Sequence, residues 1–340
     1  MPFSEILGQD DAIRHLKGFF RTGRLPHALL FLGPEGTGRR LAATRLFQAF
    51  ACEERRAGRE PFDDACGRCN ACHRVALHVA GPDTQGSYPD LHLLEPGAKG
   101  TIDNIRSIIR SLSMRSFAGG AKGLILDPAD DMRAEHANVL LKTIEEPPDD
   151  TLIVLIGTYR TQILPTILSR CIPVRFRPLA DEIIVRRLQE APPKDTTVTP
   201  EQARWAAALA QGSLGQAIKA LGGEFADLET LARDAVTEEL TGKSDPGDWS
   251  GRLAAQFKGN RSALPDWLDL MILIHRSALG AVTSALPGSL GSDAGRLRET
   301  LDPDDLARRI DGLLQIRRAI DRYAHLEISL DKLIMDLRSP

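Results

Sequence analysis

The sequence of 340 residues predicts an α/β domain with a parallel sheet, followed by helical domains. Three observations indicate this class. Short apolar runs alternate with helix-like stretches up to about residue 180, as in parallel strand–helix units. A glycine-rich loop follows the first apolar run and precedes a helix-like stretch, which is the arrangement of a P-loop. Beyond Pro178 the apolar residues recur with the period of helices.

Five apolar runs are the expected strands, and three of them are nearly continuous, as parallel strands covered on both faces should be. They span residues 28–32, 91–94, 123–127, 152–157 and 172–176. Between the second and the third, Ile102, Ile105 and Ile109 repeat at helical spacing. The sequence therefore predicts that strands and helices alternate.

The later part of the chain is expected to be helical and to divide in two. Residues 242–247 are rich in glycine and polar side chains, which is typical of a domain linker. We expect the α/β domain to cover residues 1–178, with a cysteine insert at 52–72. The helical domains are expected to cover 179–240 and 249–340.

The composition is that of an ordinary globular protein, with 42% hydrophobic and 26% charged residues. A formal net charge of -3 argues against a chain that coats nucleic acid by itself. The first residues lack a basic and apolar signal region, and no apolar run is long enough to span a bilayer. We therefore expect a cytoplasmic protein without a membrane partner, in which clustered cysteines are metal ligands rather than disulfides.

The glycine-rich loop reads GPEGTGRR over residues 33–40. A working P-loop ends in Lys and then Ser or Thr, which reach the phosphates and Mg²⁺. Arg39 stands in place of the lysine and Arg40 in place of the hydroxyl, although a guanidinium has no lone pair for a metal. Gly33, Gly36 and Gly38 still offer backbone N–H groups to an anion. We expect at most an anion here, and no turnover of Mg-ATP.

The third expected strand ends in a carboxylate, Asp127. In P-loop ATPases a carboxylate at this place holds Mg²⁺, and a Glu directly after it often polarises the attacking water. Here Pro128 follows, and it can do neither. Asp130 is expected to cap the next helix. By itself, Asp127 is equally typical of a turn at the end of a strand.

Three cysteines, Cys66, Cys69 and Cys72, have the C-x₂-C spacing of metal sites, and Cys52 lies upstream of them. Four thiolates suit tetrahedral Zn²⁺, and they also suit an iron–sulfur cluster. His73 is an alternative to Cys52 as fourth ligand, but adjacent residues rarely reach one ion. Because no nucleophile–base pair lies nearby, the sequence favours a structural metal over a catalytic one.

Arg170 lies in the tripeptide Ser169-Arg170-Cys171, between an apolar helix-like stretch and the fifth expected strand. A single arginine in such a place is most often a surface residue. An arginine at a subunit edge can instead stabilise the charge that develops on a neighbour's ATP. The residues by themselves leave both interpretations open.

These motifs together resemble the delta-prime family of bacterial DNA polymerase III clamp-loader subunits, over about residues 1–220. The most specific stretch is ANVLLKTIEEPP at residues 137–148. Further similar stretches are residues 6–9, 26–31, 33–40, 102–106, 127–132 and 163–171.

The resemblance implies an AAA+ P-loop domain with a helical lid and a helical collar for oligomerisation. It implies a zinc site at Cys52, Cys66, Cys69 and Cys72, and it makes Arg170 an arginine finger for the ATP of the next subunit. The implied function is to help load the sliding clamp onto primed DNA during replication. The implied partners are gamma/tau and delta subunits, with the clamp and primer–template DNA reached through the assembly.

Three departures from the family's ATP-hydrolysing members agree with one another. The P-loop lacks its Lys and hydroxyl, no carboxylate follows Asp127, and Gly215 stands where those members carry a sensor-2 arginine. Thr158 keeps the sensor-1 position. These departures favour a non-hydrolysing subunit, with a gamma/tau-like ATPase that uses Arg39 as the alternative. A third interpretation, a zinc-dependent nucleic-acid-binding module acting alone, conflicts with the net charge and the aromatic content of 5%.

Overall fold

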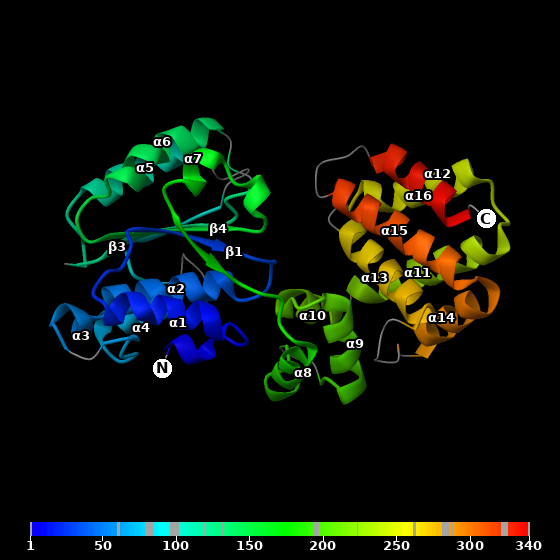
Figure 1. Cartoon of the computed structure of the whole chain (residues 1–340), viewed down its shortest axis with the longest axis horizontal. Coiled ribbons are helices and arrows are strands. Elements are labelled where there is room, and N and C mark those ends of the chain that lie inside the picture. The colour runs from blue at the N-terminus through cyan, green and yellow to red at the C-terminus, as the bar shows by residue number, and fades with distance from the viewer. Residues whose placement is uncertain are drawn as a thin grey trace. The chain divides into compact units, whose positions relative to one another are not determined.

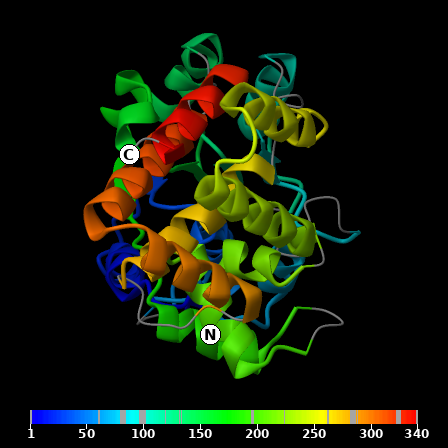
Figure 2. The same cartoon turned by 90° about the vertical axis from the view of Figure 1, so that its right-hand side faces the viewer.

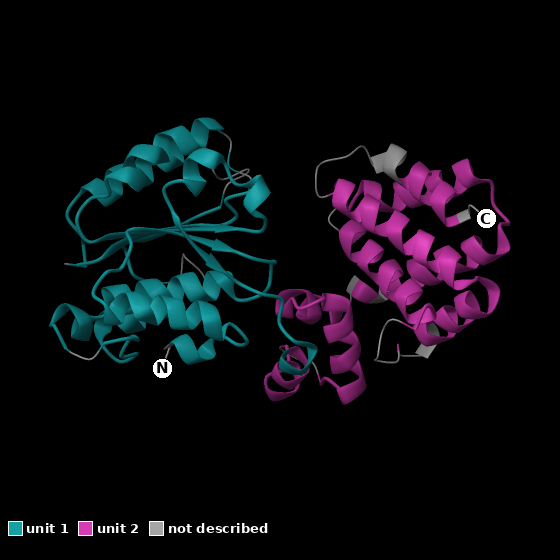
Figure 3. Ribbon diagram, viewed as in Figure 1, with its two compact units in different colours: residues 1–183 teal, residues 184–340 magenta. Residues whose placement is uncertain are grey.

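The computed structural model divides into two compact units, Met1–Ile183 and Ile184–Pro340 (Figure 3). The structure describes residues 2–59, 62–78, 85–95, 102–118, 120–130, 132, 134–193, 197–222, 224–260, 263–280, 286, 288–320 and 326–338.

The first unit is built on a five-stranded sheet in the order β2-β3-β4-β1-β5. Its strands are β1 (Ala28–Leu32), β2 (Leu91–Leu94), β3 (Lys122–Leu126), β4 (Thr151–Gly157) and β5 (Ile172–Arg175). Every neighbouring pair is parallel, and Leu30 of β1 lies opposite Leu155 of β4 on one side and Pro173 of β5 on the other. The predicted α/β class with a parallel sheet is confirmed, and each strand boundary lies within one residue of the expected one.

Helices cover both faces of this sheet (Figure 1). One face carries α1 (Asp10–Arg21), α2 (Arg39–Ala51), α3 (Glu53–Arg56) and α4 (Asn70–Leu77), and the other carries α5 (Ile102–Ser113), α6 (Ala134–Glu145) and α7 (Pro165–Leu168). Two short 3₁₀ helices, η1 (Pro2–Glu5) and η2 (Arg160–Gln162), complete the unit, and α8 (Asp181–Glu190) begins in it.

Strand β1 shows why its sequence is apolar throughout. Leu29 and Phe31 point into the core formed with α2, whereas Leu30 points into the core formed with α5 and α6. All five residues of the strand are buried. A parallel strand covered on both faces has no polar side, so the alternation typical of half-exposed strands is missing.

The second unit contains helices only, as far as the structure describes it. After α8 they are α9 (Pro200–Ala210), α10 (Leu214–Ala220), α11 (Glu224–Thr241), α12 (Pro246–Lys258), α13 (Leu264–Ala278), α14 (Gly288–Thr300), α15 (Pro303–Ile320) and α16 (Leu326–Arg338). Helix α16 lies beside α15 and α12 (Figure 2). No helix among the described residues is long and apolar enough to cross a membrane.

Of the stretch expected to be a domain linker, residues 242–245 lie between α11 and α12 within this second unit, and residues 246–247 begin α12. The three-domain division inferred from sequence, 1–178, 179–240 and 249–340, stays a prediction.

A buried polar network joins three helices of the second unit. His275 on α13 and Glu239 on α11 are fully buried, with 3.0 Å between Nε2 and Oε1, and Arg309 on α15 donates to the same carboxylate. The Nδ1 atom of His275 lies 2.8 Å from the carbonyl oxygen of Met271. Both ring nitrogens therefore face acceptors, which favours the doubly protonated ring. Burial alone would lower the pKa of His275, but the Glu239 carboxylate outweighs it and raises that pKa.

We predict that His275→Gln lowers the free energy of unfolding of the second unit by about 3 kcal/mol at pH 6, because it breaks a buried ion pair. A raised pKa means that His275 stabilises the fold fully below its unfolded pKa of about 6.5 and loses this effect as pH rises through the folded value. All three tryptophans, Trp205, Trp249 and Trp267, lie in this unit. Their fluorescence in urea at pH 6 and pH 9 measures both effects. An equal pH dependence in wild type and variant would contradict the assignment.

Candidate functional site

The P-loop-like turn lies between β1 and α2, at the edge of the sheet where the parallel strands end. Gly33 lies against the backbone just after β5, the strand beside β1, since a Cβ atom there would lie 2.4 Å from the carbonyl oxygen of Phe176. Gly36 and Gly38 have φ angles of 72° and 91°, and Gly38 is the N-cap of α2. The glycines thus form the turn that the sequence predicted, because side chains would be strained or would clash here.

Arg39, at the place of the phosphate-binding lysine, turns inward instead of toward a ligand. Its side chain is buried, and Nη1 donates to the carbonyl oxygen of Gly157 at the end of β4 at 2.5 Å. Burial lowers the pKa of Arg39, with Asp127 and Asp130 opposing this effect. The group that should reach a phosphate therefore holds the backbone of the neighbouring strand.

Arg40 stands where P-loop ATPases have the hydroxyl that holds Mg²⁺, and it binds Asp127, which stands where they have the carboxylate that holds Mg²⁺. Its Nε donates to Oδ2 of Asp127 at 2.7 Å, and its Nη2 donates to Oε1 of Glu95, which directly follows β2, at 2.9 Å. Burial works against the charge of Arg40, but hydrogen bonds from it to Asp127 and Glu95 outweigh burial and raise its pKa. The guanidinium thus stands where a cation would neutralise these carboxylates.

Asp130 does not cap the next helix, so this expectation from sequence was wrong. Its carboxylate accepts the backbone N–H of Thr158, at 2.7 Å to Oδ2 and 3.0 Å to Oδ1. Burial raises the pKa of Asp130, and the bonds from Thr158 oppose that shift. The loop after β3 turns Asp130 toward the end of β4, a sheet contact that local sequence could not indicate. Thr158, the sensor-1 match, is consequently fixed beside the P-loop strands.

The four predicted cysteines come together at the C-terminal end of α2. Cys52 ends this helix, and the other three lie in the loop before α4 and in its first turn. All four sulfur atoms lie within 4.8 Å of one another, and those of Cys66 and Cys72 are 3.9 Å apart. The exposed His73 is not part of this group. Cys171 lies in a different core.

These residues fit a single tetrahedral ion. Ligand sulfurs about 2.3 Å from zinc are separated by about 3.8 Å, close to the observed spacing. A cluster of several irons would need its ligands further apart. Backbone N–H groups of Cys66, Cys69 and Cys72 point at the sulfurs of Cys52, Cys66 and Cys69, at 3.4–3.5 Å. Such bonds stabilise thiolate charge.

Side chains around the cysteines tie the loop to the rest of the unit. Glu54 on α3 binds Arg68, which lies between two of the cysteines, at 3.0 Å. The buried Gln48 on α2 donates to the carbonyl oxygen of Cys72 at 2.6 Å. The loop that carries the cysteines is therefore attached to the same helix that begins at the P-loop-like turn.

Arg170 follows α7 and is held at the surface by the residues on either side. Cys171 is buried, and burial raises its pKa to about 12, so this thiol is a neutral anchor. The Nη1 atom of Arg170 donates to the carbonyl oxygen of Thr166 at 3.0 Å, and its Nε donates to Glu145 at the end of α6. The side chain of Arg170 is 34% exposed.

Two carboxylates in these sites had no role assigned from the sequence. Glu95 directly follows β2, so it lies at the same edge of the parallel sheet as Asp127. This position could have predicted from the sequence that the two carboxylates lie close together. Glu145 lies within the most specific stretch of the resemblance, but its partner Arg170 is 25 residues away. Only the packing of α6 beside α7 brings the two together.

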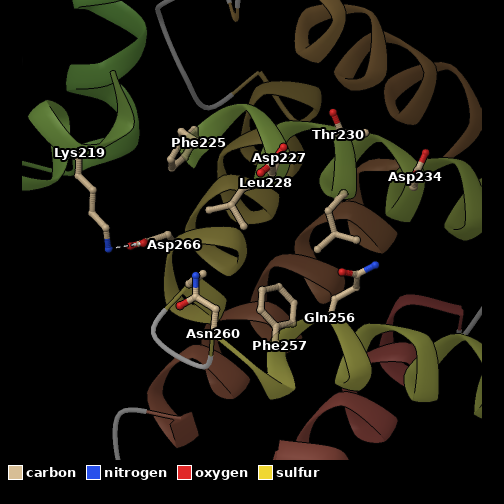
Figure 4. Close-up of a pocket in the computed structure, with 12 residues that line it drawn as sticks. Lys219, Phe225, Asp227, Leu228, Thr230, Asp234, Gln256, Phe257, Asn260 and Asp266 are labelled. Atoms are coloured by element: carbon tan, nitrogen blue, oxygen red, sulfur yellow. Dashed lines mark hydrogen bonds and ion pairs between the residues drawn. The ribbon is translucent and has the colours of Figure 1, made fainter. Parts of the chain in front are cut away.

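A separate pocket of about 610 Å³ lies in the second unit (Figure 4). Phe225, Leu228 and Phe257 form apolar walls, and Lys219 at the pocket pairs with Asp266 at 2.5 Å. The other charged residues that line it are Asp227 and Asp234. Among the described residues that line the pocket, Lys219 is the only cation, and its pairing with a carboxylate disfavours a phosphate there.

Comparison with known proteins agrees with the resemblance. A family described as "DNA polymerase III, delta subunit" matches residues 8–180. The delta' subunit of DNA polymerase III from Bacillus subtilis is 38% identical over 182 residues, which cover 53% of this chain and 50% of that protein. The delta' subunit from Pseudomonas aeruginosa is 35% identical over 149 residues, 43% of this chain and 42% of that protein.

A relative of the other kind is also similar. The tau subunit of DNA polymerase III from Bacillus subtilis is 29% identical over 235 residues, 69% of this chain and 38% of that protein. In each of these comparisons the chain spans half or less of the relative's length. The match at residues 8–180 covers the sheet, the P-loop-like turn, the cysteines and Arg170, and the chain therefore belongs to the DNA polymerase III delta subunit family.

Proposed function

We propose that the chain is a non-hydrolysing subunit of the DNA polymerase III clamp loader. In this role it helps load the sliding clamp onto primed DNA, beside gamma/tau and delta subunits. The observation that carries the proposal is the ion pair between Arg40 and Asp127. In an ATPase, the hydroxyl at the position of Arg40 and the carboxylate at the position of Asp127 both hold Mg²⁺. Here the two residues pair with each other, so neither serves as a ligand for the metal.

The neighbouring groups support the same proposal. Arg39 donates to the Gly157 carbonyl, and Pro128 supplies no base for an attacking water. A gamma/tau-like ATPase would have to break both arginine contacts before Mg-ATP could bind. The likeness to a tau subunit fits the shared P-loop framework and does not supply the missing ligands.

We predict that the isolated chain neither hydrolyses ATP nor binds Mg-ATP with useful affinity. The reason is that binding would have to displace Arg40 from Asp127 without a hydroxyl to replace it. Phosphate release at background level and titration calorimetry without heat of binding are the expected results. Turnover that disappears in Asp127→Asn would contradict the proposal, because it would show that Asp127 serves a working site.

For the arginine finger, we propose that Arg170 stabilises the phosphoryl-transfer charge on the ATP of the next subunit. Its side chain is partly exposed and already held by Thr166 and Glu145. Its neighbour Cys171 is a neutral buried thiol, so the chemistry of this tripeptide lies in the arginine.

We predict that Arg170→Ala leaves this subunit folded but lowers ATP turnover by the assembled loader. Arginine fingers contribute about 10³–10⁵ in rate in small GTPases, and the effect here should be smaller because one of several ATP sites loses its finger. Lys should restore little, since it lacks the planar fork. The measurement is the DNA- and clamp-stimulated ATPase of a reconstituted loader, with assembly checked by gel filtration. Equal rates at equal assembly would make Arg170 a plain surface residue.

A structural zinc ion is the metal that we propose for Cys52, Cys66, Cys69 and Cys72. When bound, it would cross-link the loop to α2 and supply no reaction chemistry. The short distances between the sulfurs support one ion with four thiolate ligands.

We predict one zinc ion per chain by metal analysis. Cys66→Ser and Cys52→Ser should each lose it, and the loop should become sensitive to protease, because a small insert orders poorly without its metal. Cys171→Ala is the matched control, since this fifth cysteine lies in another core and should leave the zinc content unchanged. Unchanged zinc in Cys52→Ser would remove that residue from the site, and zinc-free wild-type protein prepared without chelator would refute the assignment.

A further inference from the structure

We infer that Glu145 is a positioning residue for Arg170, holding its guanidinium so that one amino group is free to meet a phosphate. This inference rests on the proposed function of Arg170. It names the residue that fixes the position of the Arg170 side chain before the next subunit binds.

The hydrogen bonds of Arg170 divide its donors into a held part and a free part. The Nε atom donates to Oε1 of Glu145, while Nη1 donates to the Thr166 carbonyl at 3.0 Å and to Oγ of Ser169 at 3.1 Å. Within the described part of the chain, Nη2 has no hydrogen-bond partner. A guanidinium fixed on one side and open on the other can donate to a new anion without a further loss of side-chain freedom.

The packing beneath the pair makes this geometry stable. Ile144, directly before Glu145, shares a buried core with Ile167 of α7 and with Cys171. The residues next to each charged side chain are therefore anchored in the same core. The end of α6 and the turn after α7 must keep their relative positions, and the pair lies across this junction.

The position of Glu145 is hard to explain by helix stability. It is the last residue of α6, where a carboxylate opposes the helix dipole. Its pair with Arg170 is partly exposed, with side chains 46% and 34% accessible, and exposed pairs add little stability. A charge that is unfavourable for its helix and adds little stability through its ion pair is typical of a functional site.

The test compares Glu145→Ala with Glu145→Gln in the reconstituted loader. Glu145→Ala removes the acceptor, so we expect a lower kcat with unchanged KM for ATP, and about half or more of the logarithmic loss caused by Arg170→Ala. Glu145→Gln keeps an acceptor oxygen at the same length and should restore most of that loss. A purely structural role would instead lower the melting temperature of the subunit and would not be rescued in kcat by Gln.

Glu146→Ala is the matched control, because Glu146 is the adjacent exposed carboxylate and has no side-chain partner among the described residues. It should leave kcat unchanged, and a loss equal to that of Glu145→Ala would overturn the inference. The double variant Glu145→Ala/Arg170→Ala should be no slower than Arg170→Ala, whereas additive losses would show that Glu145 acts elsewhere.

Failure of the inference and failure of the proposed function give different results. If Arg170→Ala slows the loader and Glu145→Ala does not, the finger stands and the positioning role falls. If Arg170→Ala has no effect at equal assembly, the finger itself is refuted, and the role of Glu145 with it.

Discussion

An ion pair between the first turn of α2 and the end of β3 organises the edge of the sheet in this chain. Three carboxylates, Glu95, Asp127 and Asp130, lie where the parallel strands β2, β3 and β4 end. In a nucleotide-binding site a metal ion would balance such a charge. Here Arg40 binds two of them, and the third accepts N–H groups from the loop after β4. The P-loop framework thus contains its own network of contacts between arginine, carboxylate and backbone groups.

The other candidate sites of the first unit are built on the same sheet and its covering helices. Helix α2 carries the arginines at its start and Cys52 at its end, so the P-loop and the cysteine loop share one rigid element. On the opposite face of the sheet, α6 and α7 pack in one core and present Glu145 and Arg170 at the surface. The first unit thus presents this pair from a packed core on the face of the sheet opposite α2.

The second unit obtains its order in another way. Its helices are joined through a buried network of His275, Glu239 and Arg309 rather than through a sheet. Charges in such a place are retained only when they are paired, and each of these has a partner. The network contributes a definite arrangement of α11, α13 and α15, and it makes that arrangement dependent on pH.

The sequence by itself determined the strands, the parallel sheet, the helical second half and the group of Cys66, Cys69 and Cys72, because each depends on local spacing, whereas the structure decided between Cys52 and His73 as the fourth member. Continuous apolar runs mark strands covered on both faces, and C-x₂-C spacing brings thiols close whatever the fold. The sequence also showed that Arg39 and Arg40 replace the residues of a working P-loop. Only the tertiary structure decided where those arginines point, since their partners are 118 and 87 residues away. The contacts of Asp130 with Thr158 and of Glu145 with Arg170 depend in the same way on elements that meet through packing.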